Sequence, residues 1–440
     1  MSNWLRLLNH LLELQSNINK PSTALDEYVN KKLRYIVKYS YENVPFYNRL
    51  LKESKVDPSQ IKNKSDLSKI SFINKSILKN NPLKDLLSTE FVDTKLNVVK
   101  SGGSTGEPFS TYITDSEKER RLAVQLRAFL RTGQRFYNRW ASLEAFTDYS
   151  KHRTSSFIFP QIHVPLMWDT ERKIDALKSF DPYVLDGLSS SIWTLARYVN
   201  ENKVRGVSPK LVFGTGELIS PVFRQEINKA FNADYFDHVS CTEVGRTAWE
   251  CKAHIGYHMN IDTTITQFVD DEGEEVAPGE RGEIVYTSLD NYAMPLLRYK
   301  IQDIGIPIDD ECTCGVNLPM MKMIEGRHNS FIVLPNGLVI SPWKFIESIK
   351  LYLLTDEINQ YKVIQQRHDL IEIQIVKTNS QVDEEKIRNW VIQNIKDSFR
   401  ENEINLSDIE LKIVFKDSIP IAPSGKLNVV TSNLKDIPVL

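Results

Sequence analysis

A short segment near residue 100 has the composition of an anion-binding loop. It reads Ser-Gly-Gly-Ser-Thr-Gly-Glu-Pro, and its first six residues are all glycine or hydroxyl residues: Ser101, Gly102, Gly103, Ser104, Thr105 and Gly106. Glycine lets the backbone adopt positive φ and approach a ligand closely, and successive exposed N–H groups form a concavity that binds anions. A di- or triphosphate is therefore the expected ligand, and an ordinary Gly/Ser hairpin turn is the alternative.

This segment differs from two well-known phosphate-binding motifs. It lacks the Gly-Lys-Ser/Thr that ends a Walker loop. It also leads into a strand, whereas the dinucleotide-binding loop opens a helix. Apolar residues before and after it predict strands over residues 96–100 and 109–114.

A second set of residues, in the later half of the chain, has the types and grouping of a zinc site. Its members are Cys251, His258, Cys312 and Cys314. Two pairs of such soft ligands predict a structural, tetrahedral Zn²⁺ site, although the Cys-X-Cys gap is shorter than the usual two residues. His254 is the alternative to His258 as a ligand. Free thiols with surface histidines are the alternative to a metal site.

Two polar turns follow predicted strands in the middle of the chain. A strand that ends at residue 215 is followed by Gly216 and Glu217, and the next strand is followed by Thr242 and Glu243. Ligand sites in open α/β sheets gather at the carboxyl ends of strands, so these residues are expected beside a ligand. An exposed loop glutamate is the alternative for Glu243.

Five segments resemble, in chain order, the motifs of the adenylate-forming acid ligases. This superfamily includes acyl-CoA synthetases, luciferases and the adenylation domains of peptide synthetases. The five segments are 101–108, 240–245, 291–305, 325–327 and 421–427. The N-terminal part and the Asn-Tyr-Ala-Met-Pro sequence are most similar to the phenylacetate-CoA ligase and capsule-biosynthesis (CapK-like) branch. The resemblance covers nearly the whole chain.

The resemblance implies a nucleotide site built from these segments. The glycine-rich segment would hold the phosphates of ATP, and Glu243 beside Thr242 would hold the Mg²⁺ that bridges them. One carboxylate is enough, because Mg²⁺ takes phosphate oxygens and water as its other ligands. Asp303 would bind the two ribose hydroxyls with its two acceptor oxygens. Arg327, from a Gly-Arg pair, would contact ribose or phosphate.

A lysine near residue 426 would complete the catalytic set. The sequence Ser-Gly-Lys-Leu resembles the C-terminal signature of the superfamily, which makes Lys426 the catalytic lysine alongside Glu243. Its ammonium would offset the charge that develops as a carboxylate attacks the α-phosphate. A lysine without a catalytic role is the alternative, because 55 residues of the chain are basic.

The chain departs from the superfamily pattern at two places. The tyrosine that usually stacks on adenine is replaced by Val239, so the stacking is expected either to be lost or to be supplied by another side chain, with His238 and Trp249 as the candidates. The hinge residue after the Gly-Arg pair is usually Asp or Lys. Here Asn329 or Ser330 would serve, since small polar residues can absorb a change in φ and ψ.

The pattern of elements predicts an α/β protein with two domains. Residues 1–95 are expected to be mostly helical, and a small α+β domain is expected over residues 328–440. The resemblance implies that residues 1–327 form a large N-terminal adenylating domain of mixed β-sheets and helices, since a Gly-Arg pair ends that domain in the superfamily. It also implies that the small domain is mobile and carries the catalytic lysine. An apolar stripe predicts an amphipathic helix over residues 4–14.

Charged residues inside the predicted elements lead to two further expectations. A helix is predicted over residues 116–132, with Glu117, Glu119 and Arg120 on its solvent side. Arg298, within the segment that resembles the ribose-binding motif, is expected to be a buried ion-pair partner and not a ligand contact.

Composition limits the partners and the location of the protein. The 55 basic and 57 acidic residues give a net charge of −2, which lacks the basic excess of a nucleic-acid-binding protein. No apolar run reaches the length of a membrane span, and the charged N-terminal helix is not a signal peptide. A cytoplasmic protein is therefore expected. Its four cysteines are too few for a disulfide framework.

Together, these features predict an ATP-dependent ligase that acts in two steps. A small carboxylic acid attacks the α-phosphate of Mg·ATP to give an acyl-adenylate and pyrophosphate, and an acceptor then displaces AMP. The first hypothesis is a CoA ligase for an aryl or other small organic acid. The alternative is transfer to an amine or hydroxyl during polysaccharide or natural-product assembly. A third hypothesis is a nucleotide-binding protein without turnover.

Overall fold

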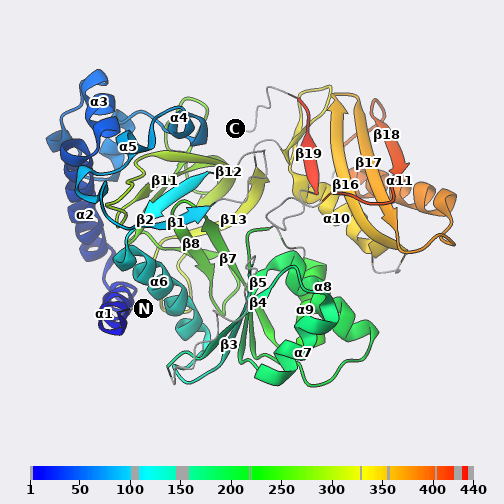
Figure 1. The fold of residues 1–440 in the computed structure, drawn as a ribbon. Coiled ribbons are helices and arrows are strands. Elements are labelled where there is room, and N and C mark those ends of the chain that lie inside the picture. The colour runs from blue at the N-terminus through cyan, green and yellow to red at the C-terminus, as the bar shows by residue number, and fades with distance from the viewer. Residues whose placement is uncertain are drawn as a thin grey trace.

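The protein consists of a large N-terminal part and a smaller C-terminal part, each built around its own β-sheet (Figure 1). The computed structural model describes residues 3–100, 109–144, 158–217, 219, 221–327, 330–353, 357–401, 404–420 and 429–434. The glycine-rich segment 101–108, Asn329 and Lys426 lie outside the described residues, so the expectations for them stay predictions.

An eleven-stranded mixed sheet forms the centre of the N-terminal part, in the order β10-β11-β12-β13-β9-β8-β7-β6-β5-β3-β4. Its strands are β3 (Trp140–Glu144), β4 (Gln161–Pro165), β5 (Val184–Leu188), β6 (Leu211–Thr215), β7 (Asp234–Cys241), β8 (Gly245–Glu250), β9 (Tyr257–Met259), β10 (Thr264–Val269), β11 (Gly282–Ser288), β12 (Tyr299–Ile308) and β13 (Met320–Arg327). Strands β3, β4, β5, β6 and β7 pair in parallel with their neighbours. The rest of the sheet, from β7 through β8, β9, β13, β12 and β11 to β10 in spatial order, is antiparallel. The hairpin β1 (Asn97–Lys100) and β2 (Ser110–Ile113) forms a separate small sheet.

Helices cover both faces of the parallel half of this sheet. One face carries α7 (Thr170–Phe180), α8 (Ser189–Glu201) and α9 (Pro221–Phe231), and the other carries α6 (Asp115–Thr132). Successive residues of a strand point to opposite faces. Val212 of β6 accordingly packs under α8 and α9, whereas Phe213 packs under α6.

The N-terminal helices pack on the antiparallel half of the sheet. They are α2 (Ser22–Asn43), α3 (Pro45–Glu53), α4 (Lys75–Lys79) and α5 (Leu83–Leu86), with 3₁₀ turns at Pro58–Gln60, Lys64–Lys69 and Thr89–Phe91. Pro45 opens α3 at its first position, where a missing N–H costs nothing. The Tyr47 hydroxyl donates to the carbonyl of Pro295 at 3.0 Å and accepts from the amide of Leu297 at 2.9 Å. Two distant segments are thereby joined.

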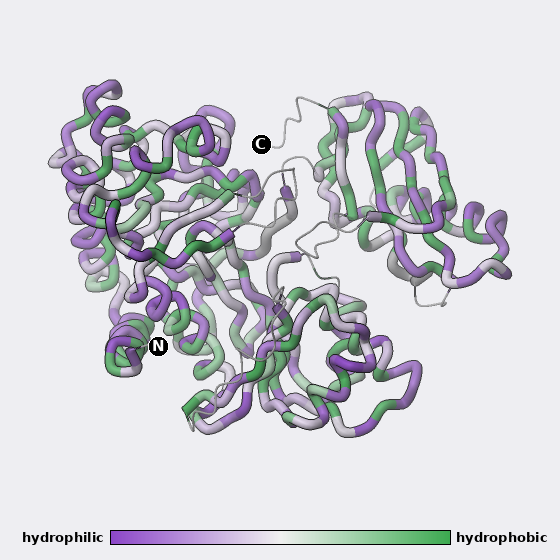
Figure 2. Tube along the Cα trace, in the orientation of Figure 1, coloured by the Kyte–Doolittle hydropathy of each residue, from purple (hydrophilic) through white to green (hydrophobic). Residues whose placement is uncertain are grey.

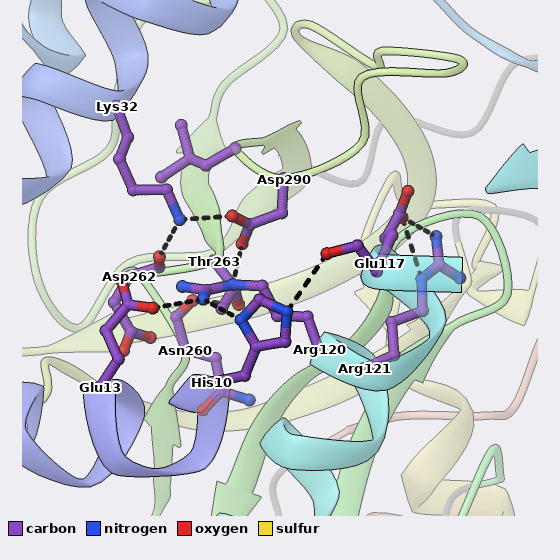
Figure 3. A network of polar contacts seen from close by, with 12 residues as sticks. His10, Glu13, Lys32, Glu117, Arg120, Arg121, Asn260, Asp262, Thr263 and Asp290 are labelled. Carbon is purple, nitrogen blue, oxygen red and sulfur yellow. Dashed lines mark hydrogen bonds and ion pairs between the residues drawn. The ribbon is translucent and has the colours of Figure 1, made fainter. Parts of the chain in front are cut away.

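The expectation that the charged residues of α6 face solvent is wrong. Glu117, Glu119 and Arg120 are only 5%, 3% and 6% exposed. Helix α1 (Trp4–Asn17) lies along α6 and covers Glu119 and Arg120. Glu117 lies on another side of α6, where it pairs with Arg121 beside the connection between β7 and β8. His10 and Glu13 of α1 point toward the polar network around Arg120 that Figure 3 shows.

Helix α1 therefore has an unusual distribution of residues. Arg6 pairs with Glu119, and Glu13 pairs with Arg120 at 2.7 Å. The apolar stripe is divided, because Leu7, Leu11 and Leu14 are buried while Trp4, Leu5, Leu8 and Leu12 are exposed. A long basic side chain can bury its stem and keep its charge paired, so inward charges are tolerated here.

Arg298 is buried as expected, but its partners are backbone carbonyls. Its guanidinium donates to Ser68, Ile70 and Gly273 at 2.8–3.0 Å and lies over the ring of Phe72. Several carbonyl oxygens can satisfy a guanidinium as an acid would. Arg298 thus fastens the N-terminal helices to the sheet.

The C-terminal part contains a four-stranded sheet in the order β18-β17-β16-β19. Its elements are β14 (Ile332–Val333), β15 (Val339–Ile340), α10 (Pro342–Leu353), β16 (Ile358–Arg367), β17 (Leu370–Lys377), α11 (Glu384–Arg400), β18 (Glu410–Phe415) and β19 (Val430–Ser432). Apolar and polar residues alternate along these strands (Figure 2), and the apolar face packs with α10 and α11 in a separate hydrophobic core. Strand β13 ends at Arg327, and the division into two domains at this residue stays a prediction. The mobility of this part stays a prediction.

No helix in the described ranges combines the length and apolarity that a bilayer-spanning segment needs.

A buried carboxyl group makes the stability of the large sheet depend on pH. Asp237 of β7 accepts hydrogen bonds from the Tyr257 hydroxyl and the His238 amide, both at 3.0 Å. Burial, reinforced by nearby Glu250, raises the pKa of Asp237 to about 7 from its ordinary value of 3.8. Between these values the folded protein holds a proton that the unfolded chain has lost. The free energy of unfolding must therefore fall as pH rises through this range.

We expect Asp237→Asn to remove this loss. Relative to that of the variant, the free energy of unfolding of the native protein should fall by up to about 1.4 kcal/mol per pH unit between pH 5 and 7, and should fall no further above pH 7. Urea unfolding of both proteins at several pH values measures the difference. Asp271→Asn, on an exposed turn, is the control. Parallel pH curves for the native protein and Asp237→Asn would contradict the prediction.

Candidate active site

The carboxyl ends of β6 and β7 meet at one edge of the sheet. The Thr215 and Ser240 hydroxyls are 2.8 Å apart, and Thr215 also donates to the carbonyl of His238 at 2.9 Å. Gly216 follows with φ of +81°. The Glu217 carboxylate accepts the amide of Ser190 at the start of α8, at 2.9 Å. A carboxylate at a helix N-terminus is stabilised by the helix dipole, so Glu217 has a structural partner in addition to its predicted nucleotide role.

Thr242 and Glu243 lie in the tight connection between β7 and β8. Glu243 is 8% exposed, and its Oε2 accepts a hydrogen bond from the Cys241 thiol at 2.9 Å. The Tyr299 hydroxyl at the start of β12 also hydrogen-bonds Glu243, and burial raises the pKa of Tyr299 far above its ordinary value. The Glu243 carboxylate therefore lies between Cys241 at the end of β7 and Tyr299 at the start of β12.

Asp303 and Arg327 lie opposite each other on the neighbouring strands β12 and β13. Arg327 Nε is 3.6 Å from Asp303 Oδ1, and both side chains are partly exposed. Asp303 also acts electrostatically on Cys241 and Tyr299, which both hydrogen-bond the Glu243 carboxylate. The structure thus brings together predicted site residues from three segments that are far apart in the sequence.

Lys75 also lies close to Glu243, and no sequence motif predicts this position. It follows Asn74, the cap of α4. Ile73 docks on the sheet, because its amide donates to the carbonyl of Arg298 at 3.1 Å and its carbonyl accepts from the amide of Lys300 at 2.8 Å. Burial lowers the pKa of Lys75, and Glu243 opposes that shift. The β-bridge between Ile73 and Tyr299 of β12 brings Lys75 to this position beside Glu243.

The two expected replacements for the adenine-stacking tyrosine are both in the core. His238 is 2% exposed and lies beside the rings of Phe129 and Phe213. Trp249 is 1% exposed and packs near His258. Neither ring is exposed enough to stack on adenine, so the alternative that assigns the stacking to His238 or Trp249 is wrong.

The four predicted zinc ligands form a compact cluster. The donor atoms of Cys251, His258, Cys312 and Cys314 all lie within 4.8 Å of one another. Sγ of Cys251 and Sγ of Cys312 are 3.5 Å apart, and Cys314 Sγ is 3.2 Å from His258 Nε2. Zn–S bonds of about 2.3 Å in a tetrahedron separate the sulfurs by about 3.8 Å. The donor types and spacing therefore fit Zn²⁺.

The surroundings of His258 suit a metal ligand better than those of His254. The second ring nitrogen of His258 faces the carbonyl of Leu318 at 3.3 Å, which is how ligating histidines are usually oriented. Burial lowers the pKa of His258 and keeps the imidazole neutral. His254 is instead 2.9 Å from Glu250 and stacks on Phe236, so it lies outside the cluster.

Sequence comparisons identify relatives of two kinds. No family model matches the chain. A phenylacetate-coenzyme A ligase of Thermus thermophilus is 27% identical over 375 residues, which cover 82% of each chain. Protein CapK of Staphylococcus aureus is 22% identical and covers 98% of this chain and 91% of its own.

Among solved structures, 2-hydroxyisobutyryl-CoA ligase is similar over nearly the whole chain. Its complex with 2-HIB-AMP in the postadenylation state has a TM-score of 0.79 at 18% identity and covers 95% of this chain and 91% of that one. Its complex with CoA in the thioesterification state gives 0.65. The chain therefore has the α/β fold of the adenylate-forming ligases. The predicted resemblance to the phenylacetate-CoA ligase and CapK-like branch is confirmed by its relatives.

Proposed function

We propose that the protein is an ATP-dependent, AMP-forming acid ligase that makes an acyl-adenylate and transfers the acyl group to CoA. The observation that carries this proposal is the convergence of Glu243, Asp303 and Arg327 at one sheet edge. Relatives named phenylacetate-coenzyme A ligase support it, because they align with 72–82% of this chain. ATP and CoA are metabolites of the cytoplasm, which makes that location part of the proposal.

In the first step, the proposed roles follow from the chemistry of each side chain. Asp303 would accept hydrogen bonds from the ribose hydroxyls, with Arg327 close to ribose or phosphate. The segment 101–108 would bind the phosphates, together with the turn at Gly216 and Glu217. Lys426 would neutralise the charge that develops at the α-phosphate.

Glu243 fits a magnesium ligand. Its carboxylate is a hard oxygen donor between a thiol and a hydroxyl, and Mg²⁺ takes its remaining ligands from phosphate and water. When bound, Mg²⁺ would reduce the negative charge of the phosphates that the acid must approach. Thr242 would place Glu243 from the preceding position in the chain.

The cysteine–histidine cluster is proposed to be a structural zinc site. Four protein ligands close a tetrahedral Zn²⁺, and a closed site leaves no position for a substrate. The cluster also joins the loop after β8 to the loop before β13. Its proposed role is therefore to stabilise the fold.

The substrate is proposed to be a small carboxylic acid, aryl acids first. Transfer to an amine or hydroxyl is the second candidate, because CapK, the relative that covers 98% of this chain, is not named as a CoA ligase. Structures of 2-hydroxyisobutyryl-CoA ligase hold an acyl-AMP and CoA, which supports CoA as the acceptor.

ATP–pyrophosphate exchange with a panel of carboxylic acids tests the proposal. We expect exchange with at least one acid in the absence of CoA, because adenylation precedes transfer. Adding CoA should then yield the acyl-CoA and AMP. Exchange without thioester formation would favour an amine or hydroxyl acceptor. Binding of Mg·ATP without exchange for any acid would favour a protein without turnover.

A further inference from the structure

An arginine of α6 reaches across to the connection that carries Glu243. Arg121 donates from Nη1 to the carbonyl of Thr242 at 3.1 Å and from Nη2 to the carbonyl of Glu243 at 2.7 Å. Arg121 therefore holds the backbone of both residues of the Thr-Glu pair from a helix that lies far from them in the sequence.

Glu117, one helical turn earlier, fixes the direction of this guanidinium. Its Oε1 accepts from Arg121 Nε at 3.1 Å and from Nη2 at 2.8 Å. Glu117 is 5% exposed, and burial raises its pKa to about 7 although Arg121 opposes the shift. An arginine offers five donors in a rigid plane, so it can bind an acid and two carbonyls at once.

Gly245 leaves room for this arrangement. It follows the Thr-Glu pair with φ of +92°, a conformation that glycine adopts without strain. A Cβ at this position would lie 3.3 Å from the Cγ and Cδ atoms of Arg121. The close packing indicates that the stem of Arg121, and not only its charge, defines the path of the connection.

The neighbouring arginine on the same helix has different partners. Arg120 pairs with Glu13 and Asp290, each at 2.7 Å, in the network between α1 and α6. Figure 3 shows the Arg120 side chain directed toward this network and Arg121 toward Glu117. Substitutions at Arg120 and Arg121 can therefore distinguish an effect on overall stability from an effect on the connection between β7 and β8 that carries Glu243.

We propose that Arg121, oriented by Glu117, is a positioning residue that fixes the Glu243 carboxylate for Mg·ATP. This inference rests on the proposed function, since it assumes that Glu243 is the magnesium ligand. Arg121 acts through the backbone of the Thr242-Glu243 pair and does not itself contact substrate. Small displacements of a positioned group can cost a large factor in affinity or rate.

Calorimetric binding of Mg·ATP and the magnesium dependence of pyrophosphate exchange test this inference. We expect Arg121→Ala to weaken Mg·ATP binding about tenfold or more and to raise the half-saturating Mg²⁺ concentration to a similar extent. Arg121→Lys should recover part of the loss, because it keeps a charge and the donors of a single nitrogen but not the planar fork. Arg120→Ala is the matched control. It should lower the melting temperature while Mg·ATP affinity and the magnesium dependence stay within about twofold of the native protein.

Native-like Mg·ATP affinity and magnesium dependence in Arg121→Ala, with a lower melting temperature alone, would overturn the inference. If Arg121→Ala does not fold, Arg121→Lys and Arg121→Gln decide the question by the same measurements. Binding needs no acid substrate. A native protein that binds Mg·ATP without exchange would therefore refute the proposed function and still report on Arg121. A native protein that does not bind Mg·ATP would overturn both.

Discussion

Replacing Lys426 by alanine is expected to abolish acyl-adenylate formation and to leave acyl transfer largely intact. The ammonium would offset charge only while the carboxylate attacks the α-phosphate, and groups that stabilise such charge are worth about 10²–10³-fold in rate. The second step would start from an adenylate that already exists. Pyrophosphate exchange measures the first step, and release of AMP from a synthetic acyl-adenylate with CoA measures the second.

Lys412→Ala provides the matched control for this experiment. Lys412 is an exposed lysine of β18 in the same part of the protein, and its replacement should leave both half-reactions unchanged. Equal losses in both half-reactions of Lys426→Ala would refute the assigned role, because a residue that acts only in adenylation cannot slow transfer from a preformed adenylate.

Removing the metal from the cysteine–histidine cluster is expected to destabilise the protein strongly. Metal analysis should find about one zinc per chain, and Cys312→Ser should lose it. Zinc binding in small peptides is worth roughly 10–16 kcal/mol, and we expect a loss of several kcal/mol here because the surrounding sheet remains. Chelation followed by thermal unfolding measures the change, and added Zn²⁺ should restore stability to the native protein.

Cys241→Ser separates the zinc cluster from cysteine chemistry in general. Cys241, the one cysteine of the sequence that is not a predicted zinc ligand, lies outside the cluster and donates a hydrogen bond to Glu243. This variant should keep its zinc. A native protein that contains no zinc and is indifferent to chelation would refute the proposed site.

The parts of the fold that the sequence predicted are those that depend on local patterns. The helix over 116–132 and the strand before Gly216 follow from apolar periodicity and appear as α6 and β6, with ends shifted by a residue or so. The cluster of Cys251, His258, Cys312 and Cys314 was predicted from residue type and from the short spacing within each pair of ligands. The ligand types alone identify the candidates, and the fold brings them within reach.

The parts that it could not predict depend on contacts between distant segments. Glu119 has the charge of a solvent-facing residue, but in the fold Arg6 of α1 pairs with it and covers it. No residue near Glu119 in the sequence predicts that contact. Lys75 joins the site only through the bridge between Ile73 and β12. His238 and Trp249 have the chemistry of stacking residues, but the strand register turns them into the core.

The docking of the N-terminal helices on the sheet also has a consequence for synthesis on the ribosome. Tyr47 and Ile73 find their backbone partners between residues 295 and 300, more than 220 positions later in the chain. At about 5–20 residues per second, translation needs roughly 11–50 s to reach them. The first hundred residues emerge early but must wait for these partners, and chaperones that shield apolar helices have that interval in which to act.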